Sequence, residues 1–269
     1  MQTGGMRTEL VSEPGDPARP NEDFASVALP ASGQGGSLVV LDGVTPPDDG
    51  GGCLHSVPWF TARLGGALGE LTVSLPDVPL AEVLSRALAR TADSHAATCD
   101  LSHPRTPQAT VVLARWSPLS VEYLVLSDSA LLVEAPDGTV TALLDDRLDR
   151  LPRSALATHA LVDSTLRNKE GGFFTAAADP SVASRAVTGS LQRGEVGALA
   201  ALTDGATRWV ERFRQGDWTD CLTLIRKEGP RALVDRVRTL ERADAERVPL
   251  RRGKAHDDAT VVFAELSPR

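Results

Sequence analysis

Acidic residues stand next to short apolar runs at five places along this chain. These places are Glu22-Asp23, Asp42-Gly43, Asp128, Asp204-Gly205 and Asp257-Asp258. Apolar runs of this length suggest strands, and strand ends are where a rigid sheet can hold carboxylates from distant parts of the sequence close together. Converging carboxylates repel one another unless a cation neutralises them, and all-oxygen sites favour hard ions such as Mg²⁺, Mn²⁺ or Ca²⁺. The chain is therefore a candidate metal–carboxylate enzyme.

Each acidic site also has a simpler structural explanation. Asp-Gly is a common turn dipeptide, so Asp42-Gly43 alone favours a loop. Asp204 precedes a predicted helix and would be a good N-cap. Asp257-Asp258 could open a strand, and Glu22-Asp23 could lie in a solvated turn. Each explanation is favoured when its site is taken singly, but the recurrence and the order of the sites favour a shared function.

The elements that must position these acids come in blocks. Strands are predicted over residues 24–29, 37–41, 109–116, 120–126, 131–134, 140–144, 197–202 and 259–263. Helices are predicted over residues 56–71, 80–98, 206–214, 217–227 and 230–245. Residues 1–20 are polar and rich in Gly and Pro, and we expect them to be partly disordered; residues 145–180 lack periodicity and are expected to form an exposed insertion. Strands grouped apart from paired helices favour one α+β domain.

Composition narrows the class of protein. The chain has 269 residues, a formal net charge of −8 and no block of Lys and Arg, which argues against nucleic acid or an anionic membrane as a partner. It has no apolar stretch long enough to span a bilayer and no apolar core of a signal peptide near its start. Three cysteines, an odd number, argue against a disulfide framework. We expect a cytoplasmic protein that acts as a monomer.

The order of the acidic motifs carries a family resemblance. Along the chain the motifs are Asn21-Glu22-Asp23, Leu41-Asp42-Gly43, Ser127-Asp128-Ser129, Thr203-Asp204-Gly205 and Asp257-Asp258-Ala259-Thr260-Val261-Val262. This ordered set resembles the type-2C metal-dependent Ser/Thr protein phosphatases (the PPM family), and in particular their bacterial members. The predicted helices and the insertion fall between the motifs as they do in that family. The resemblance extends over residues 7–266.

The resemblance implies a fold and a dinuclear metal site. The fold is a central sandwich of two antiparallel β-sheets with helices on both outer faces, a four-layer αββα arrangement. Two Mg²⁺ or Mn²⁺ ions would lie at one end of the sandwich. Carried over by position, Asp42 would bridge both metals, the Gly43 carbonyl would bind the second, and Asp204 and Asp257 would bind the first. The resemblance thus makes Asp42, Asp204 and Asp257 the residues on which catalysis depends.

Further residues take supporting roles by the same resemblance. Glu22 would hold the water shell of the second metal, with Asp23 as its supporting neighbour. Asp128, together with Asp204, matches the position where bacterial members bind a third metal. Arg19 precedes Glu22 by three residues, one fewer than the family spacing, and is the candidate for binding the substrate phosphate. Pro20 biases Arg19 towards an extended backbone, although a surface arginine in a proline-rich turn would look the same.

The sequence departs from the family pattern at two motifs. After Gly43 the chain continues Val44-Thr45-Pro46-Pro47, without the histidine that eukaryotic members use as a candidate general acid. A metal-bound water could protonate the leaving oxygen instead, or His55 in the following loop could do so, although an isolated histidine at a helix entrance is more often a cap or a surface residue. At the third motif Ser127 replaces glycine and Ala130 replaces the usual arginine, which leaves a third metal open.

A second metal-binding constellation is present in the sequence. Cys53-x-His55 and Cys99-x3-His103 could together supply four zinc ligands. Neither spacing is a common structural zinc motif, and Cys99 also fits the apolar face of the predicted helix as a small buried residue. The sequence favours that structural explanation.

The expected activity is hydrolysis of phosphate monoesters, with phosphoserine or phosphothreonine in proteins as substrate. Two divalent ions roughly 3.5–4 Å apart would lower the pKa of a shared water and clamp the phosphoryl group for in-line displacement. Three alternatives stay open. One is a pseudophosphatase that binds a partner without turnover, and another is a small-molecule phosphatase that uses the same metals. The third, a calcium-binding module, is disfavoured because the acids are dispersed along the chain.

Overall fold

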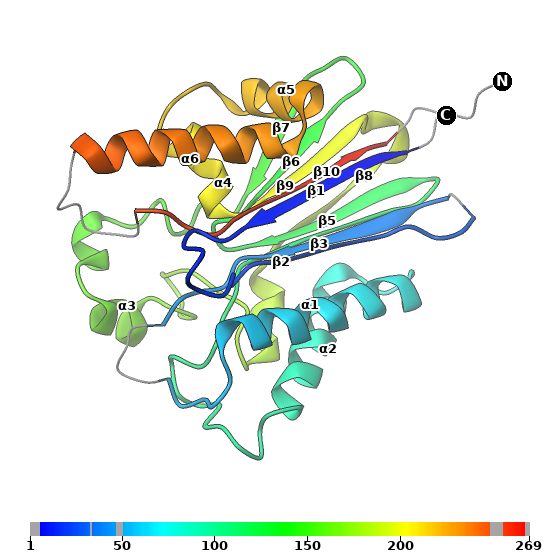
Figure 1. The fold of residues 1–269 in the computed structure, drawn as a ribbon. Helices are drawn as coiled ribbons and strands as arrows, with labels where there is room; N and C mark the ends of the chain where they lie inside the picture. The colour runs from blue at the N-terminus through cyan, green and yellow to red at the C-terminus, as the bar shows by residue number, and fades with distance from the viewer. Residues whose placement is uncertain (1–5, 33, 47–50, 248–254, 267–269) are drawn as a thin grey trace.

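The computed structural model describes residues 6–32, 34–46, 51–247 and 255–266, and it contains two five-stranded antiparallel sheets (Figure 1). The first sheet has the order β1 (Arg7–Glu13), β10 (Ala259–Glu265), β9 (Ala198–Leu202), β6 (Ala130–Glu134), β7 (Val140–Leu144). The second has the order β2 (Phe24–Ala28), β3 (Gly36–Leu41), β4 (Val111–Trp116), β5 (Ser120–Leu126), β8 (Val187–Gln192). Neighbouring strands pair antiparallel throughout both sheets.

The central strands are apolar at every position because both of their faces are buried. In β3, Leu38 and Val40 point between the two sheets and pack with Val262 of β10. Val39 and Leu41 point to the opposite face and pack under helices. An unbroken apolar run is therefore expected in a sandwich that is covered on both outer faces.

Helices cover both outer faces of the sandwich (Figure 1). Helices α1 (Val57–Ser74) and α2 (Leu80–Asp93) pack on the sheet that contains β3. Helices α4 (Asp204–Glu211), α5 (Trp218–Glu228) and α6 (Pro230–Arg247) pack on the sheet that contains β10. The predicted four-layer αββα sandwich is confirmed. In the described part of the chain, no helix is both long and apolar enough to cross a membrane.

Two strands were not predicted, and both are polar edge strands. β1 places a single buried residue, Val11, among exposed and half-buried neighbours, and it lies within the segment expected to be partly disordered. β8 has no buried residue. Edge strands are solvated on one side and often carry polar side chains, so their alternation is weak. Helix α2 also ends at Asp93, five residues before the predicted end, so Cys99 lies beyond the helix rather than on its apolar face.

The region expected to be an exposed insertion, residues 145–180, has two different halves. Its first half carries a 3₁₀ turn (Arg153–Leu156) and helix α3 (His159–Thr165), and most of its residues are exposed or half-buried. Its second half is buried: Phe174 and Ala176 join the core below β3 and α2. The expectation of exposure is therefore wrong for the second half, where Phe173 and Phe174 stand between glycines and small residues and form no periodic apolar pattern.

Candidate active site

The antiparallel pairing brings the acidic motifs to one end of the sandwich. Phe24, at the start of β2, pairs with Leu41, at the end of β3, so Glu22-Asp23 and Asp42 leave the sheet at the same end. Val261 pairs with Leu202, which places the residues before β10 beside the residues after β9. Acids separated by more than 200 positions in the sequence therefore meet at one edge.

Asp42 and Asp204 are in direct contact. The backbone N–H of Asp204 donates to Asp42 Oδ2 over 3.2 Å. Asp42 is held from the other side by Thr110, whose hydroxyl accepts the Asp42 N–H at 3.2 Å and contacts the Ser129 hydroxyl at 2.6 Å. Asp204 is the first residue of α4, where the unpaired N–H groups of a helix favour negative charge.

Burial and mutual repulsion raise the pKa values of these carboxyls. Burial, followed by the charges of Asp204 and Asp23, raises the pKa of Asp42 well above its usual range. Burial and the charge of Asp257 raise the pKa of Asp204 to about 7. Burial also raises the pKa of Asp128. Such a set of anionic oxygen donors fits a hard divalent cation, which would remove the repulsion that the carboxylates otherwise meet.

Two glycines of the motifs allow backbones to approach closely. A Cβ on Gly43 would lie 2.5 Å from the Glu22 carbonyl oxygen, and one on Gly205 would lie 1.9 Å from the Asp258 carbonyl oxygen. Any side chain at either position would therefore push two acidic motifs apart. This explains why glycine follows Asp42 and Asp204 in structural terms: it lets the acids converge.

Asp258 fixes the position of Glu22. Its Oδ2 accepts the Glu22 N–H at 2.6 Å, and its Oδ1 accepts the Gly15 N–H at 2.8 Å. The Glu22 carboxylate accepts a hydrogen bond from the Thr45 hydroxyl. Asp258 had no role predicted from the sequence, yet it joins the first and last acidic motifs.

Asp23 faces inwards beneath the other acids. Its Oδ2 accepts the Thr203 hydroxyl at 3.0 Å, whereas its Oδ1 is buried and has no hydrogen-bond partner among the residues that the structure describes. Burial raises the pKa of Asp23 to about 8, and the charge of Asp258 adds to the increase. An unpaired buried carboxyl oxygen at this place gives the acidic cluster a further oxygen donor.

A network of charged residues that the sequence analysis missed holds Asp257. Arg208 of α4 donates to Asp257 Oδ2 at 2.8 Å and to the Glu241 carboxylate at 2.5 Å. Glu241 of α6 is buried and also accepts Arg238 at 2.8 Å, and His256 Nδ1 lies 2.9 Å from it. One feature of the sequence could have predicted that Arg208 lies near the acids: it follows Asp204 by four residues, so both lie on one face of a helix.

Asp128 stands at the end of β5 beside a strained residue. Ser127 has φ +69°, in the left-handed region. Its hydroxyl donates to Asp128 Oδ1 at 3.0 Å, and its N–H donates to the buried Asp145 carboxylate at 2.8 Å. Ser127 replaces the glycine expected from the family that the sequence resembles, and its backbone has the conformation that glycine adopts most readily.

We expect Ser127→Gly to be more stable than Ser127→Ala by about 1 kcal/mol, because both variants lose the hydroxyl but only alanine keeps the left-handed strain. Alanine is normally the better residue in regular structure, so the expected order is the reverse of the usual one. Urea denaturation of the two variants measures the difference. Equal stabilities, or a more stable alanine variant, would contradict the assigned backbone conformation.

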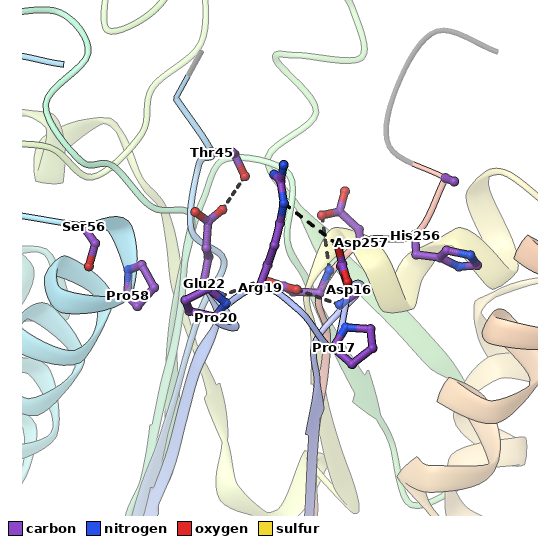
Figure 2. Close-up of a pocket in the computed structure, with 13 residues that line it drawn as sticks. Asp16, Pro17, Arg19, Pro20, Glu22, Thr45, Ser56, Pro58, His256 and Asp257 are labelled. Carbon is purple, nitrogen blue, oxygen red and sulfur yellow. Dashed lines mark hydrogen bonds and ion pairs between the residues drawn. The ribbon is translucent and has the colours of Figure 1, made fainter. Parts of the chain in front are cut away.

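Two clefts open beside the acids. One, of about 720 Å³, is lined by Glu22, Asp257, Asp258 and His256, with Thr45 at its rim. Figure 2 shows that the side chain of Arg19 extends into this cleft between Glu22 and Asp257. Arg19 is exposed, and its nearest ion pair is a 4.0 Å contact with Asp16, so its guanidinium faces the opening.

The second cleft, of about 360 Å³, is lined by Asp42, Asp128, Asp204 and Asp257 together with residues of the segment 145–180. One of these residues is His159, at the start of α3, to which the sequence analysis gave no role. His55, the residue suggested there as a substitute general acid, lies elsewhere, in a cluster with Cys53, His95 and Cys99. That suggestion is therefore wrong.

Comparison with known proteins agrees with the fold. No protein-family model matches the sequence, and no curated protein matches it. Among solved structures, the chain is similar to the Ser/Thr phosphatase Stp1 from Staphylococcus aureus (TM-score 0.61, 14% identity, 97% of this chain and 95% of that chain). It is also similar to the Ser/Thr phosphatase PstP/Ppp of Mycobacterium tuberculosis (TM-score 0.61, 19% identity, 97% and 99%). A third similar structure is the S. agalactiae Ser/Thr phosphatase (TM-score 0.61, 16% identity, 97% and 100%).

The chain thus has the fold of the bacterial type-2C Ser/Thr phosphatases over nearly its whole length. The resemblance that the order of its acidic motifs predicts is confirmed at the level of the fold.

Proposed function

We propose that this protein is a metal-dependent phosphatase that hydrolyses phosphoserine and phosphothreonine in proteins. The observation that carries the proposal is the convergence of Asp42, Asp204 and Asp257 on one cleft, in a chain with the fold of Ser/Thr phosphatases. Carboxyls whose pKa values are raised by burial and by neighbouring charges are concentrated at functional sites, which favours an active enzyme over a protein that has kept only the fold. Free thiols favour a cytoplasmic location.

The residues of the acidic end would hold two Mn²⁺ or Mg²⁺ ions. Asp42 would bridge them, Asp204 and Asp257 would complete one site, and Glu22 with the Gly43 carbonyl would complete the other. Bound there, the ions would supply a water of lowered pKa and positive charge against the phosphate. Asp128 with Asp204 would hold a third ion, since both residues line the 360 Å³ cleft and also a smaller cleft of about 240 Å³.

The protein's own residues fix this arrangement. Arg208 orients Asp257 through an ion pair, and the buried Glu241 holds Arg208 in place. Asp258 fixes the backbone of Glu22. Because these partners are partly or fully buried, the carboxylates keep their positions before substrate arrives, which is what preorganised catalysis requires.

Arg19 would bind the phosphate of the substrate. We expect Arg19→Ala to raise KM for a phosphopeptide about tenfold, because a hydrogen bond to a charged group contributes on the order of 1.5–3 kcal/mol. Arg19→Lys should recover part of the loss, since lysine keeps the charge but not the paired donors. Arg86→Ala, on the exposed surface of α2, is the matched control. If KM is unchanged in Arg19→Ala, Arg19 does not bind the phosphate of the substrate.

The substrate class is tested with the purified full chain and Mn²⁺. Phosphate release is compared for peptides carrying phosphoserine, phosphothreonine or phosphotyrosine and for sugar phosphates. The proposal expects the highest kcat/KM for the phosphoserine and phosphothreonine peptides. Higher values for the sugar phosphates would instead establish a small-molecule phosphatase that uses the same site.

A further inference from the structure

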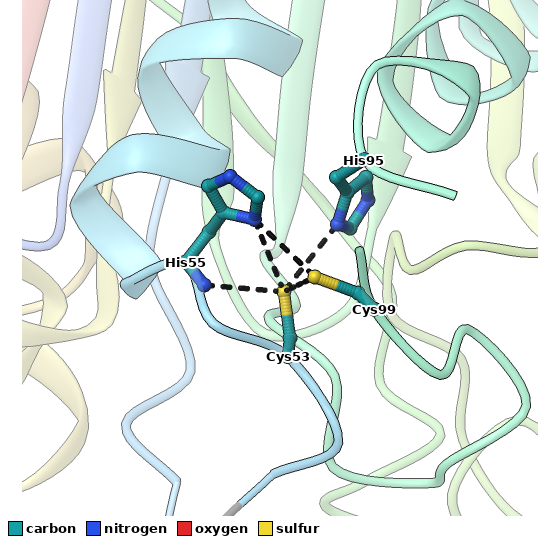
Figure 3. A group of neighbouring side chains, drawn as sticks. All are labelled: Cys53, His55, His95 and Cys99. Atoms are coloured by element: carbon teal, nitrogen blue, oxygen red, sulfur yellow. Dashed lines mark hydrogen bonds between the residues drawn. The ribbon is translucent and has the colours of Figure 1, made fainter. Parts of the chain in front are cut away.

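A second group of metal-binding side chains lies outside the acidic site. Cys53 and His55 precede α1, and His95 and Cys99 follow α2 (Figure 3). One ligand atom from each residue lies within 4.8 Å of the corresponding atoms of the other three. All four side chains point to a common centre, although the two pairs are 40 residues or more apart in the sequence.

The distances within this cluster fit a tetrahedral ion. Cys53 Sγ lies 3.3 Å from His95 Nδ1 and 3.6 Å from His55 Nδ1, and Cys99 Sγ lies 3.3 Å from His55 Nδ1. Tetrahedral zinc, with bonds of about 2.0–2.3 Å, places its ligand atoms roughly 3.3–3.8 Å apart. The two sulfur atoms are 3.0 Å apart, so binding would separate them by less than about 1 Å.

Each of the two sulfur atoms accepts one backbone N–H group. The backbone N–H of Leu54 donates to Cys99 Sγ, and that of His55 donates to Cys53 Sγ, both over 3.4 Å. A neutral thiol is a weak acceptor, whereas a metal-bound thiolate gains from such donors.

The rings of both histidines are held by Trp59 in the first turn of α1. His55 stacks on Trp59 with a centroid distance of 3.9 Å, and His95 packs against it at 5.2 Å. His95 is only 3% exposed, so its ring has little freedom to turn. Ligands that are held in place before binding lose less entropy when the ion arrives.

Backbone contacts next to the cluster hold the segment that contains Cys53 close to the segment that contains Cys99. The Asp100 N–H donates to the Gly52 carbonyl at 2.8 Å, which joins the residues that flank Cys53 and Cys99. Gly52 has φ +68°, and a Cβ there would lie 2.4 Å from the Cβ of His103. The close approach of the two segments therefore depends on glycine at this position.

We propose that Cys53, His55, His95 and Cys99 form a structural zinc site that ties the entrance of α1 to the end of α2. Four protein ligands leave no open position, which is typical of structural rather than catalytic zinc. A disulfide between the cysteines would not explain why two histidines point at the sulfur atoms. The ligand set corrects the one considered from the sequence, because His103 accepts the backbone N–H of Arg105 and lies outside the cluster.

The zinc site would stabilise one wall of the large cleft. Ser56 caps α1 by accepting the Trp59 N–H at 3.3 Å, and Ser56 and Pro58 line the 720 Å³ cleft. These residues directly follow His55. The proposal does not depend on the proposed phosphatase activity, because it concerns ligands that are separate from the acidic site.

The test measures zinc in the full chain, produced without a polyhistidine tag and dialysed against metal-free buffer. We expect about one zinc per chain in the wild type, because a closed site with two thiolates releases zinc slowly. Cys99→Ala and His95→Ala should retain almost none, and His103→Ala, the matched control, should retain the wild-type amount.

Cobalt substitution of the wild type keeps the test valid if these variants do not fold. We expect the cobalt-loaded wild type to show a thiolate-to-cobalt charge-transfer band that disappears when zinc is added. Carboxylates do not produce this band, so it should persist in Asp204→Asn. The proposal is overturned if the wild type retains no zinc and gives no such band, if mass spectrometry finds a Cys53–Cys99 disulfide in the freshly purified protein, or if folded Cys99→Ala keeps its zinc.

Discussion

Asp42→Asn is expected to abolish metal-dependent phosphatase activity and, at the same time, to stabilise the metal-free protein. Activity should fall by at least about a hundredfold, because under the proposed function Asp42 would be the carboxylate shared by both ions at the reaction centre. The metal-free fold should gain about 1–3 kcal/mol, because burial and four neighbouring aspartates make a charged carboxyl at this position unfavourable. Asparagine keeps the shape and removes the titrating group.

The two effects are measured on the same preparations. Turnover of p-nitrophenyl phosphate with Mn²⁺ gives the first, and urea denaturation in EDTA gives the second. Asp137→Asn is the matched control: Asp137 lies in the exposed turn between β6 and β7, and its own turn hydrogen bonds to Thr139 lower its pKa. That variant should keep its activity and gain no stability. If the Asp42→Asn protein is folded and fully active, Asp42 has no role in the reaction. If it is less stable than the wild type in EDTA, the Asp42 carboxyl is not destabilised by burial and neighbouring charges as expected.

The metal-free protein is expected to lose stability as pH rises through the neutral range. The pKa of Asp204 lies at about 7 and that of Asp23 at about 8 in the folded protein, both raised mainly by burial. In the unfolded chain both would lie near the ordinary value of about 3.9. Between these limits the folded state binds more protons than the unfolded state, so the free energy of unfolding falls as pH rises.

This expectation is tested by urea denaturation in EDTA at intervals from about pH 5 to pH 8.5. In this range each carboxyl with a raised pKa lowers the free energy of unfolding by up to about 1.4 kcal/mol per pH unit. Mn²⁺ should reverse the trend, because it binds the deprotonated carboxylates and therefore binds more tightly at higher pH. Asp23→Asn should flatten the fall in EDTA, whereas Asp137→Asn should not. If the stability of the metal-free protein is constant or rises across this range, the pKa values of these carboxyls are not raised in the folded state.

The central strands could be predicted because their signal is local, whereas the two-sheet sandwich was predicted only through the family resemblance. Buried strands such as β3 are apolar at every position, and Asp-Gly at their ends marks the turn. The order of the motifs then predicted the fold, although no contact between residues distant in the sequence was known. The edge strands β1 and β8 were missed because one or both of their faces meet solvent and the pattern fades.

The supporting contacts could not be predicted, because they join residues that are distant in the sequence. Arg208 meets Asp257 and Glu241 across 49 and 33 positions. In the cysteine cluster, the ligand set predicted from the sequence contained His103, although His95 stands at the same spacing on the other side of Cys99. Only the turn after α2, which brings His95 back towards Cys53, decides between them.

The most direct test of the central claim is hydrolysis of p-nitrophenyl phosphate by the purified wild-type chain with Mn²⁺, with Mg²⁺ and with EDTA, beside Mn²⁺ binding measured by calorimetry. The account predicts turnover that depends on the metal, stops in EDTA and is lost in Asp42→Asn and Asp204→Asn. A folded protein that binds Mn²⁺ at the acidic site but hydrolyses neither this ester nor a phosphopeptide would contradict it. That result would establish a pseudophosphatase that has kept the metal site for binding alone.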